Sequence, residues 1–129
     1  MAKRFQVKKL SSAPEEVLRI DHKSFRAVLL NLTGKSGDYW VSYFPSINVS
    51  GYGLNENEAI EDLLFNTKIF IEDLFQLPLN KRIEELKKLG WEQKKYFKKK
   101  LKKNASYELN IKELFDNPDE IKREILQVA

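Results

Sequence analysis

The pattern of hydrophobic and polar positions predicts strands in the first half of the chain. Residues 25–32 form a short apolar run, which is typical of a strand buried on both faces. Residues 33–38 contain two glycines and predict a turn, and the aromatic residues 39–44 predict a second strand. Pro45 ends this strand, because proline cannot donate to a sheet ladder. Residues 47–50 alternate between apolar and polar, which predicts a third, half-buried strand.

A helix is predicted from Glu56 to Phe75 or Gln76. Asn55 is a favourable N-cap, and Glu58 stands at the third helical position, as in a capping box. The acidic residues near its start complement the positive end of the helix dipole. Pro78 then prevents the helix from continuing.

This helix has two apolar stripes, although a helix on a sheet needs only one stripe about 100° wide. The first stripe consists of Ala59, Leu63, Phe70 and Leu74. The second stripe consists of Ile60, Leu64, Ile71 and Phe75. Either later helices of the same chain cover the second stripe, or it is the seam of a homodimer.

The chain beyond residue 78 has a mainly helical pattern. A short helix is expected over residues 79–90, with Gly90 after its last turn and Trp91 packed onto the core. Residues 92–106 are ambiguous, and residues 107–115 fit a strand or a helix capped by Ser106, of which we expect the helix. A final helix is predicted from Asn117 as cap and Pro118 at the first helical position. Its apolar side would consist of Ile121, Ile125 and Val128.

Together these elements predict an α+β fold. The expected architecture is a small antiparallel sheet of three to four strands, one long helix packed on it, and a helical C-terminal third. A chain of 129 residues fits a single domain spanning residues 1–129. Residues 25–76 form its sheet–helix core, and residues 79–129 form a Lys-rich, mainly helical extension.

Composition narrows the chemistry. The sequence has no Cys, which excludes disulfides, thiolate nucleophiles and zinc–thiolate sites. It has one His, which excludes any site built on two imidazoles, and His22 lies between charged residues, as surface histidines do. No apolar run approaches the ~18 residues of a membrane helix, and no apolar segment follows the basic N-terminus. We therefore expect a cytoplasmic protein without a membrane partner, metal or cofactor.

Charge is distributed in blocks along the chain. Residues 54–80 contain one basic and six acidic residues, whereas residues 81–103 contain eleven basic and three acidic residues. The densest basic strip consists of Lys94, Lys95, Lys98, Lys99, Lys100, Lys102 and Lys103. This strip is either a phosphate-binding site or a solvated surface whose Lys stems cover apolar area.

Two stretches resemble the HicB family of antitoxins. Members of that family have an aromatic strand ending in Pro, a short strand, and Gly-Asp-Thr-x-Glu-Glu-Ala at the start of a helix. The matching stretches here are Tyr39–Pro45 and Gly53–Ala59, with Asn55 at the cap. The resemblance covers about residues 25–76 and implies a truncated ribonuclease-H-like fold.

The resemblance also implies a function without catalysis. An antitoxin of this family would bind and neutralise a small basic ribonuclease toxin, and the acidic helix is a complementary surface for it. Ribonuclease H chemistry needs carboxylates converging on two metal ions, and here the strand region supplies only Asp38, in a turn. The expected partner-binding residues are Glu56, Glu58, Glu61, Asp62, Trp40 and Tyr43. The alternative is a nucleic-acid-binding accessory protein that uses the Lys94–Lys103 strip.

Overall fold

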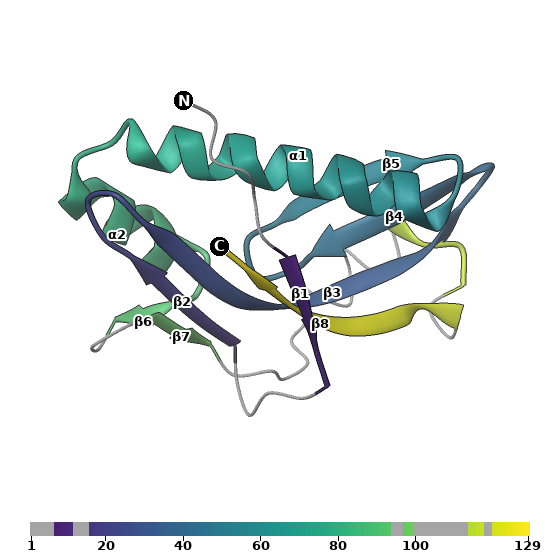
Figure 1. The fold of residues 1–129 in the computed structure, drawn as a ribbon, viewed down its shortest axis with the longest axis horizontal. Coiled ribbons are helices and arrows are strands. Elements are labelled where there is room, and N and C mark those ends of the chain that lie inside the picture. Colours follow the sequence, from purple (N-terminus) through teal and green to yellow (C-terminus); the bar gives the residue numbers. More distant parts are fainter. Residues whose placement is uncertain (1–6, 12–15, 94–96, 100–113, 118–119) are drawn as a thin grey trace.

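The computed structural model describes residues 7–11, 16–93, 97–99, 114–117 and 120–129 (Figure 1). The described elements are β1 (Val7–Leu10), β2 (Glu16–Ile20), β3 (Phe25–Ser36), β4 (Tyr39–Phe44), β5 (Val49–Gly53), α1 (Glu56–Phe75), α2 (Leu79–Lys88), β6 (Glu92–Gln93), β7 (Phe97–Lys99) and β8 (Lys122–Val128). The strands form one antiparallel sheet. The α+β class and the antiparallel sheet are therefore confirmed, and the sheet is larger than the three to four strands predicted.

The sheet forks at β3, its longest strand. On one edge of β3, the first residues pair with β2 and the last residues pair with β4. The opposite edge pairs with β8 over residues 27–33. Between β2 and β4 the backbone N–H of Leu30 donates to Glu16 Oε2 at 3.0 Å, so a side chain takes the place of a strand partner. A backbone N–H inside the fold needs a hydrogen-bond acceptor, and at the fork no strand supplies one to Leu30. The buried Glu16 carboxylate is that acceptor.

The turn predicted over residues 33–38 is shorter than expected. β3 continues to Ser36, and only Gly37 and Asp38 form the turn into β4. Gly37 has a φ of 62°, the left-handed conformation that suits glycine in a tight hairpin. Gly34 lies inside the strand instead, where a Cβ would come within 2.8 Å of Phe115 Cδ1. The missing side chain at Gly34 therefore makes room for the Phe115 ring on the sheet.

The helix predicted at the C-terminal end is wrong, because Lys122–Val128 is strand β8. Leu126 and Val128 are buried beside Leu29 and Ala27 of β3, their partners in register. The spacing of Ile121, Ile125 and Val128 fits a helix, but Leu126 and Val128 alternate equally well as a strand. The pairing edge of β3 decides between them, since strand formation depends on cross-strand neighbours. The C-terminal third is therefore not mainly helical in the residues that the structure describes.

Helix α1 lies across one face of the sheet, and α2 packs near its C-terminal end (Figure 1). The larger hydrophobic cluster lies between α1 and the sheet and includes Leu29, Phe44, Leu63 and Leu74. A smaller cluster on the opposite face contains Leu32, Val41, Tyr43 and Phe115. Among the described residues, no helix combines the length and the apolar character needed to cross a membrane.

Helix α2 ends as its sequence predicts. Gly90 has a φ of 98°, its N–H donates to the carbonyl of Lys87 at 3.0 Å, and the N–H of Trp91 donates to the carbonyl of Leu86 at 3.1 Å. These two bonds form a Schellman motif. Trp91 is 2% exposed, so the expected packing of its ring onto the core is confirmed.

Candidate partner-binding surface

The N-cap predicted at the start of α1 is present, and Glu58 reaches back to the Asn55 side-chain amide in place of the backbone N–H that a capping box uses. Asn55 Oδ1 accepts a hydrogen bond from the N–H of Glu58, and Asn55 Nδ2 donates to Glu58 Oε2, both at 2.9 Å. Asn55 has an extended backbone, as an N-cap residue should. Glu56 and Glu58 both lie in the first turn, where the helix dipole favours negative charge. The acidity of this end of α1 therefore follows partly from helix capping.

Two glycines of β5 allow α1 to lie very close to the sheet. A Cβ on Gly51 would lie 2.1 Å from the backbone N of Leu63, and one on Gly53 would lie 2.5 Å from the backbone N of Ala59. No side chain fits at such distances. The position of the acidic half of α1 is thus set by backbone-to-backbone approach.

Asp62 and Asn66 bind the outer edge of β5. Asp62 Oδ2 accepts a hydrogen bond from the N–H of Tyr52, and Asn66 Nδ2 donates to the carbonyl of Ser50, both at 2.9 Å. Among the described strands, β5 pairs only with β4, so these groups belong to an open edge. Asp62, predicted to bind a partner, thus makes a contact within the chain that covers part of this edge.

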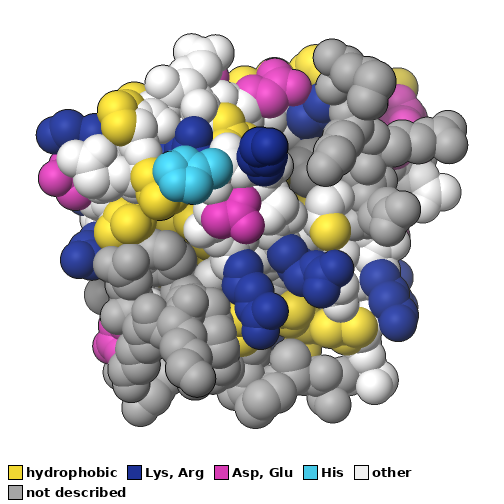
Figure 2. All heavy atoms as spheres, turned by 60° about the vertical axis from the view of Figure 1, so that its left-hand side comes forward, with side chains coloured by type: hydrophobic (Ala, Val, Ile, Leu, Met, Phe, Trp, Pro, Cys, Tyr) yellow, Lys and Arg dark blue, Asp and Glu magenta, His cyan; other side chains and the backbone are white. Residues whose placement is uncertain are grey.

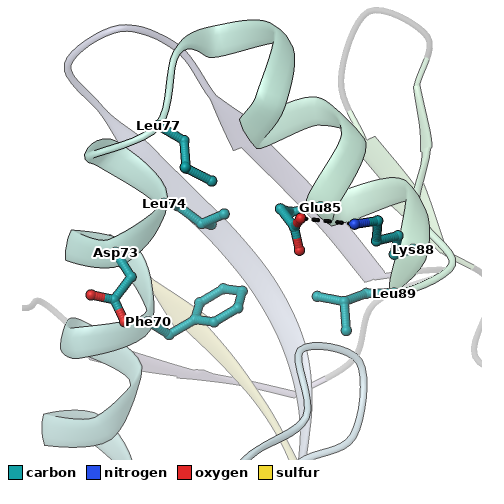
Figure 3. A pocket seen from close by; sticks show the side chains of 7 residues that line it. All are labelled: Phe70, Asp73, Leu74, Leu77, Glu85, Lys88 and Leu89. Atoms are coloured by element: carbon teal, nitrogen blue, oxygen red, sulfur yellow. Dashed lines mark hydrogen bonds and ion pairs between the residues drawn. The ribbon is translucent and has the colours of Figure 1, made fainter.

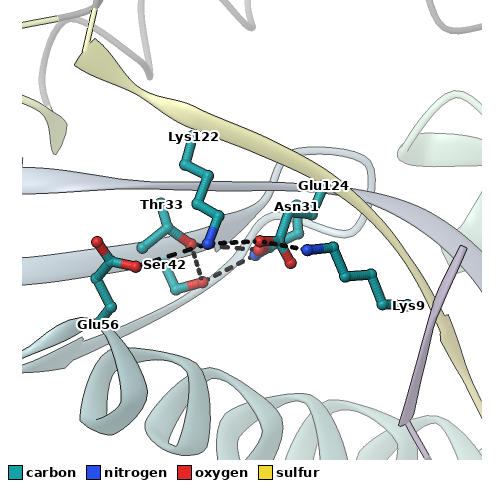
Figure 4. A network of polar contacts seen from close by, with 7 residues as sticks. All are labelled: Lys9, Asn31, Thr33, Ser42, Glu56, Lys122 and Glu124. Atoms are coloured by element: carbon teal, nitrogen blue, oxygen red, sulfur yellow. Dashed lines mark hydrogen bonds and ion pairs between the residues drawn. The ribbon is translucent and has the colours of Figure 1, made fainter. Parts of the chain in front are cut away.

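Glu56 belongs to an ion-pair network on the α1 side of the sheet (Figure 4). Lys122 Nζ lies 2.9 Å from Glu124 Oε1 and 3.8 Å from Glu56 Oε2, and Lys9 Nζ lies 3.4 Å from Glu124 Oε1. The hydrogen bond from Lys122 lowers the pKa of Glu124, and the same bond raises the pKa of Lys122. Glu56 therefore contributes to a link between α1 and β8.

Buried polar side chains lie next to this network. Asn31 Nδ2 donates to Ser42 Oγ at 2.8 Å, and Thr33 Oγ1 lies 2.9 Å from Ser42 Oγ. All three residues are at most 2% exposed. Among the described residues, no buried side-chain nitrogen or oxygen lacks a hydrogen-bond partner. These hydrogen bonds join Asn31 and Thr33 of β3 to Ser42 of β4, so they help to hold the two strands in register.

The outer face of α1 carries two exposed apolar side chains that the sequence reasoning missed. Phe65 is 62% exposed and Ile69 is 41% exposed. They lie one helical turn apart, with the exposed Glu61 four residues before Phe65 and the exposed Glu72 three residues after Ile69. The sequence does contain a signal for this exposed pair, because both residues are apolar but fall outside the two apolar stripes of the helix. We call this surface the outer face of α1, defined by Glu58, Glu61, Phe65, Ile69 and Glu72.

The two aromatic residues predicted for partner binding have different environments. Tyr43 is 2% exposed, and its hydroxyl donates to Asn48 Oδ1 at 2.9 Å, so its ring fills the smaller hydrophobic cluster. Trp40 is half-buried, with Lys35 Nζ 5.8 Å from its ring centroid. The exposed aromatic side chains of this region are instead Tyr39 and Tyr52, on the sheet face opposite α1.

The predicted dimer seam is largely occupied within the chain. Ile71 is buried in the main core, and Leu64 and Phe75 are partly buried and pack against that core. Arg82 lies over the Phe75 ring, with its guanidinium carbon 4.6 Å from the ring centroid. Ile60 is half-buried. The sheet and α2 thus cover much of the second stripe of α1.

Most of the Lys94–Lys103 strip lies outside the described residues. Only the backbone of Phe97–Lys99 is described, as strand β7 paired with β2 and β6. Figure 2 shows several Lys and Arg side chains on the face that also bears His22. His22 is exposed in the turn between β2 and β3, where Asp21 accepts hydrogen bonds from the N–H groups of Lys23 and Ser24.

A search of the described residues finds no group of three or more His, Asp or Glu side chains placed to hold a metal ion. The candidate site is the outer face of α1, beside the covered edge of β5. Comparison with protein-family models, curated proteins and solved structures finds no match to this chain.

Proposed function

We propose that the protein is a non-catalytic, HicB-like antitoxin-type protein that binds and neutralises a small basic ribonuclease toxin. The proposal joins the sequence resemblance to the order β3, β4, β5, α1, which is the strand–strand–strand–helix order expected for that family. The observation that carries it is the outer face of α1, where Phe65 and Ile69 are exposed between acidic side chains.

The energetics of this surface favour a protein partner. Burying a Phe or Ile side chain fully contributes roughly 1.5–3 kcal/mol, so this pair can anchor an interface. Glu58, Glu61 and Glu72 around the pair attract a basic partner and accelerate its association. A second copy of α1 facing this surface would bring like charges together, which favours a basic partner over self-association here.

Coexpression tests the function. The protein to test as the toxin is the product of a short, basic open reading frame beside the gene for this chain, and the readout is the growth of cells that express both proteins. We expect the wild-type chain to restore growth and the double variant Phe65→Lys, Ile69→Lys to fail to restore it. Circular dichroism checks that the double variant is folded. If the wild-type chain does not protect the cells, the antitoxin function is wrong.

Tyr39→Lys is the matched control for this surface. Tyr39 is a large aromatic residue, 54% exposed, on the sheet face opposite α1. This variant should neutralise the toxin as well as the wild-type chain does. If Tyr39→Lys abolishes protection and the α1 double variant does not, the toxin binds the other face of the molecule.

A further inference from the structure

A hollow of about 290 Å³ lies between the C-terminal part of α1 and helix α2 (Figure 3). Leu74, which is 4% exposed, forms part of its base. Phe70, Leu77 and Leu89 are half-buried and project into the gap between the two helices. The hollow is therefore walled mostly by carbon and open to solvent.

Charged residues border this apolar wall. Lys88 Nζ lies 3.0 Å from Glu85 Oε1, so these two side chains neutralise each other on the α2 side. Asp73, on the α1 side, is exposed and leaves one negative charge in excess at the border. The border is therefore net negative, which favours an apolar group attached to a cation and disfavours one attached to an anion.

The size of the hollow limits its occupant. Its volume lies just below the range for small-molecule sites, about 300–1,000 Å³. One large aliphatic or aromatic side chain suits it better than a nucleotide or an extended cofactor. An aromatic side chain also contributes a large buried area from a single residue.

The hollow borders the outer face of α1 through Asp73. Ile69 of that face precedes Phe70 of the hollow, and Asp73 lies one helical turn beyond Ile69. We propose that this hollow is an anchor pocket that takes one large apolar side chain from a basic segment of the partner protein. The inference rests on the proposed function and adds where the partner inserts and what chemistry the inserted segment has.

Two small probes of opposite charge test the pocket without the partner. Phenethylamine and 3-phenylpropionate carry the same ring, and each is titrated into ¹⁵N-labelled full-length protein at neutral pH. We expect phenethylamine to shift the amide signals of Leu77 and Leu89, with a dissociation constant at least threefold lower than that of the acid. Equal binding of the two probes, or no shift at these residues, would overturn the pocket.

Variants then separate pocket binding from surface binding. Leu89→Trp fills the hollow and should abolish the phenethylamine shifts, while Leu54→Trp, at a site 69% exposed and away from the hollow, should retain them. Asp73→Lys leaves the apolar wall intact and should make the pocket prefer 3-phenylpropionate over phenethylamine. This second variant keeps the test valid if Leu89→Trp does not fold. If Leu89→Trp is folded and still binds the amine, or Asp73→Lys still prefers it, the assignment is wrong.

The pocket and the antitoxin function can fail separately. Amine binding together with a wild-type chain that does not neutralise the toxin would leave the pocket standing and remove the function. Neutralisation that needs Phe65 and Ile69, without any probe binding, would leave the function standing and remove the pocket. When both hold, Leu89→Trp should also weaken toxin neutralisation. The dissociation constant between the purified variant and the toxin should then rise at least tenfold.

Discussion

Arg82 of α2 donates a hydrogen bond from Nη1 to the carbonyl oxygen of Asp21, which lies 61 positions earlier in the chain, at 2.8 Å. Its Nε donates to the carbonyl of Leu77 at 2.9 Å, and its Nη2 donates to the carbonyl of Phe75 at 3.0 Å. The residue is 7% exposed. One guanidinium thus joins the end of α1, the start of α2 and the turn between β2 and β3. It also brings positive charge to the last carbonyls of α1, whose own last turn has no basic residue.

We expect Arg82→Ala to lower the free energy of unfolding by about 2–4 kcal/mol, because it leaves three carbonyl groups without their donor. Arg82→Lys should recover only a minor part of this loss, since an ammonium group lacks the planar fork of donors. Urea unfolding followed by tryptophan fluorescence measures both changes. Lys81→Ala, at an exposed neighbouring position, is the control and should stay within ~0.5 kcal/mol of the wild type. An equally small loss of stability in Arg82→Ala would show that the three hydrogen bonds of its guanidinium do not stabilise the fold.

Glu16 makes a second connection between distant segments. It is 1% exposed and accepts hydrogen bonds from the N–H of Leu30 and the hydroxyl of Ser46, while the indole of Trp91 donates to the carbonyl of Ser46. Glu16→Ala should therefore cost about 2–4 kcal/mol, because two buried donors lose their acceptor. Chemical denaturation gives the loss, and Trp91 emission reports the change around Ser46. The exposed Glu84→Ala is the comparison, and an equal effect of the two substitutions would rule out this role for Glu16.

Gly51 should not tolerate a side chain. Gly51→Ala places a Cβ against the backbone of Leu63 and must displace α1 from β5, which we expect to cost more than about 3 kcal/mol. Thermal unfolding measures the loss. Gly37→Asn is the matched control, because the site is open and Asn adopts a positive φ more readily than other residues. That variant should lose no more than about 1 kcal/mol, and a similarly small loss at Gly51 would show that α1 is not held this closely.

Asp62→Ala should expose the edge of β5, because the N–H of Tyr52 loses its acceptor. Open strand edges pair with one another, so we expect the variant to self-associate at concentrations where the wild type does not. Light scattering over a concentration series detects this. Glu61→Ala, on the solvent side of the same turn, removes the same charge and should leave the molecular mass unchanged. Equal behaviour of the two variants would mean that charge, and not the edge contact, controls association.

The pH dependence of stability should include a contribution from Glu124. The hydrogen bond from Lys122 lowers the pKa of Glu124, so its stabilisation is present above the ordinary carboxyl range and is lost as the pH falls through the lowered folded-state value. Wild-type stability should therefore decline below about pH 4. Glu124→Gln should decline less steeply, which urea midpoints between neutral and acid pH will measure. Parallel curves for the two proteins would contradict the link.

Lys122 should act at the opposite end of the pH scale. The same hydrogen bond raises its pKa, so its stabilisation is present below the ordinary lysine range and is lost as the pH rises through the raised folded-state value. Lys122→Gln should remove this alkaline loss. The control is Lys81→Gln, which breaks only an exposed ion pair within α2.

The sequence alone determined the features that depend on neighbouring residues. The Asn55 N-cap, the stop before Pro78 and the turn at Gly90 each need only a few consecutive residues, and all three are present in the structure. The strand over Tyr39–Phe44 follows from its aromatic and β-branched residues and from the proline after it.

Only the tertiary structure decided the features that depend on distant partners. β8 is a strand because β3 offers it an edge almost a hundred residues away in the chain, although its local spacing fits a helix equally well. Glu16 is buried because the fork of the sheet needs an acceptor, and Tyr43 is buried because Phe115 packs on its face. Phe65 and Ile69 remain exposed because both flanks of α1 are already in contact with the sheet and α2. Whether a side chain is buried depends on which elements pack against it. A local sequence pattern therefore cannot predict burial where the same residues fit two different packed structures.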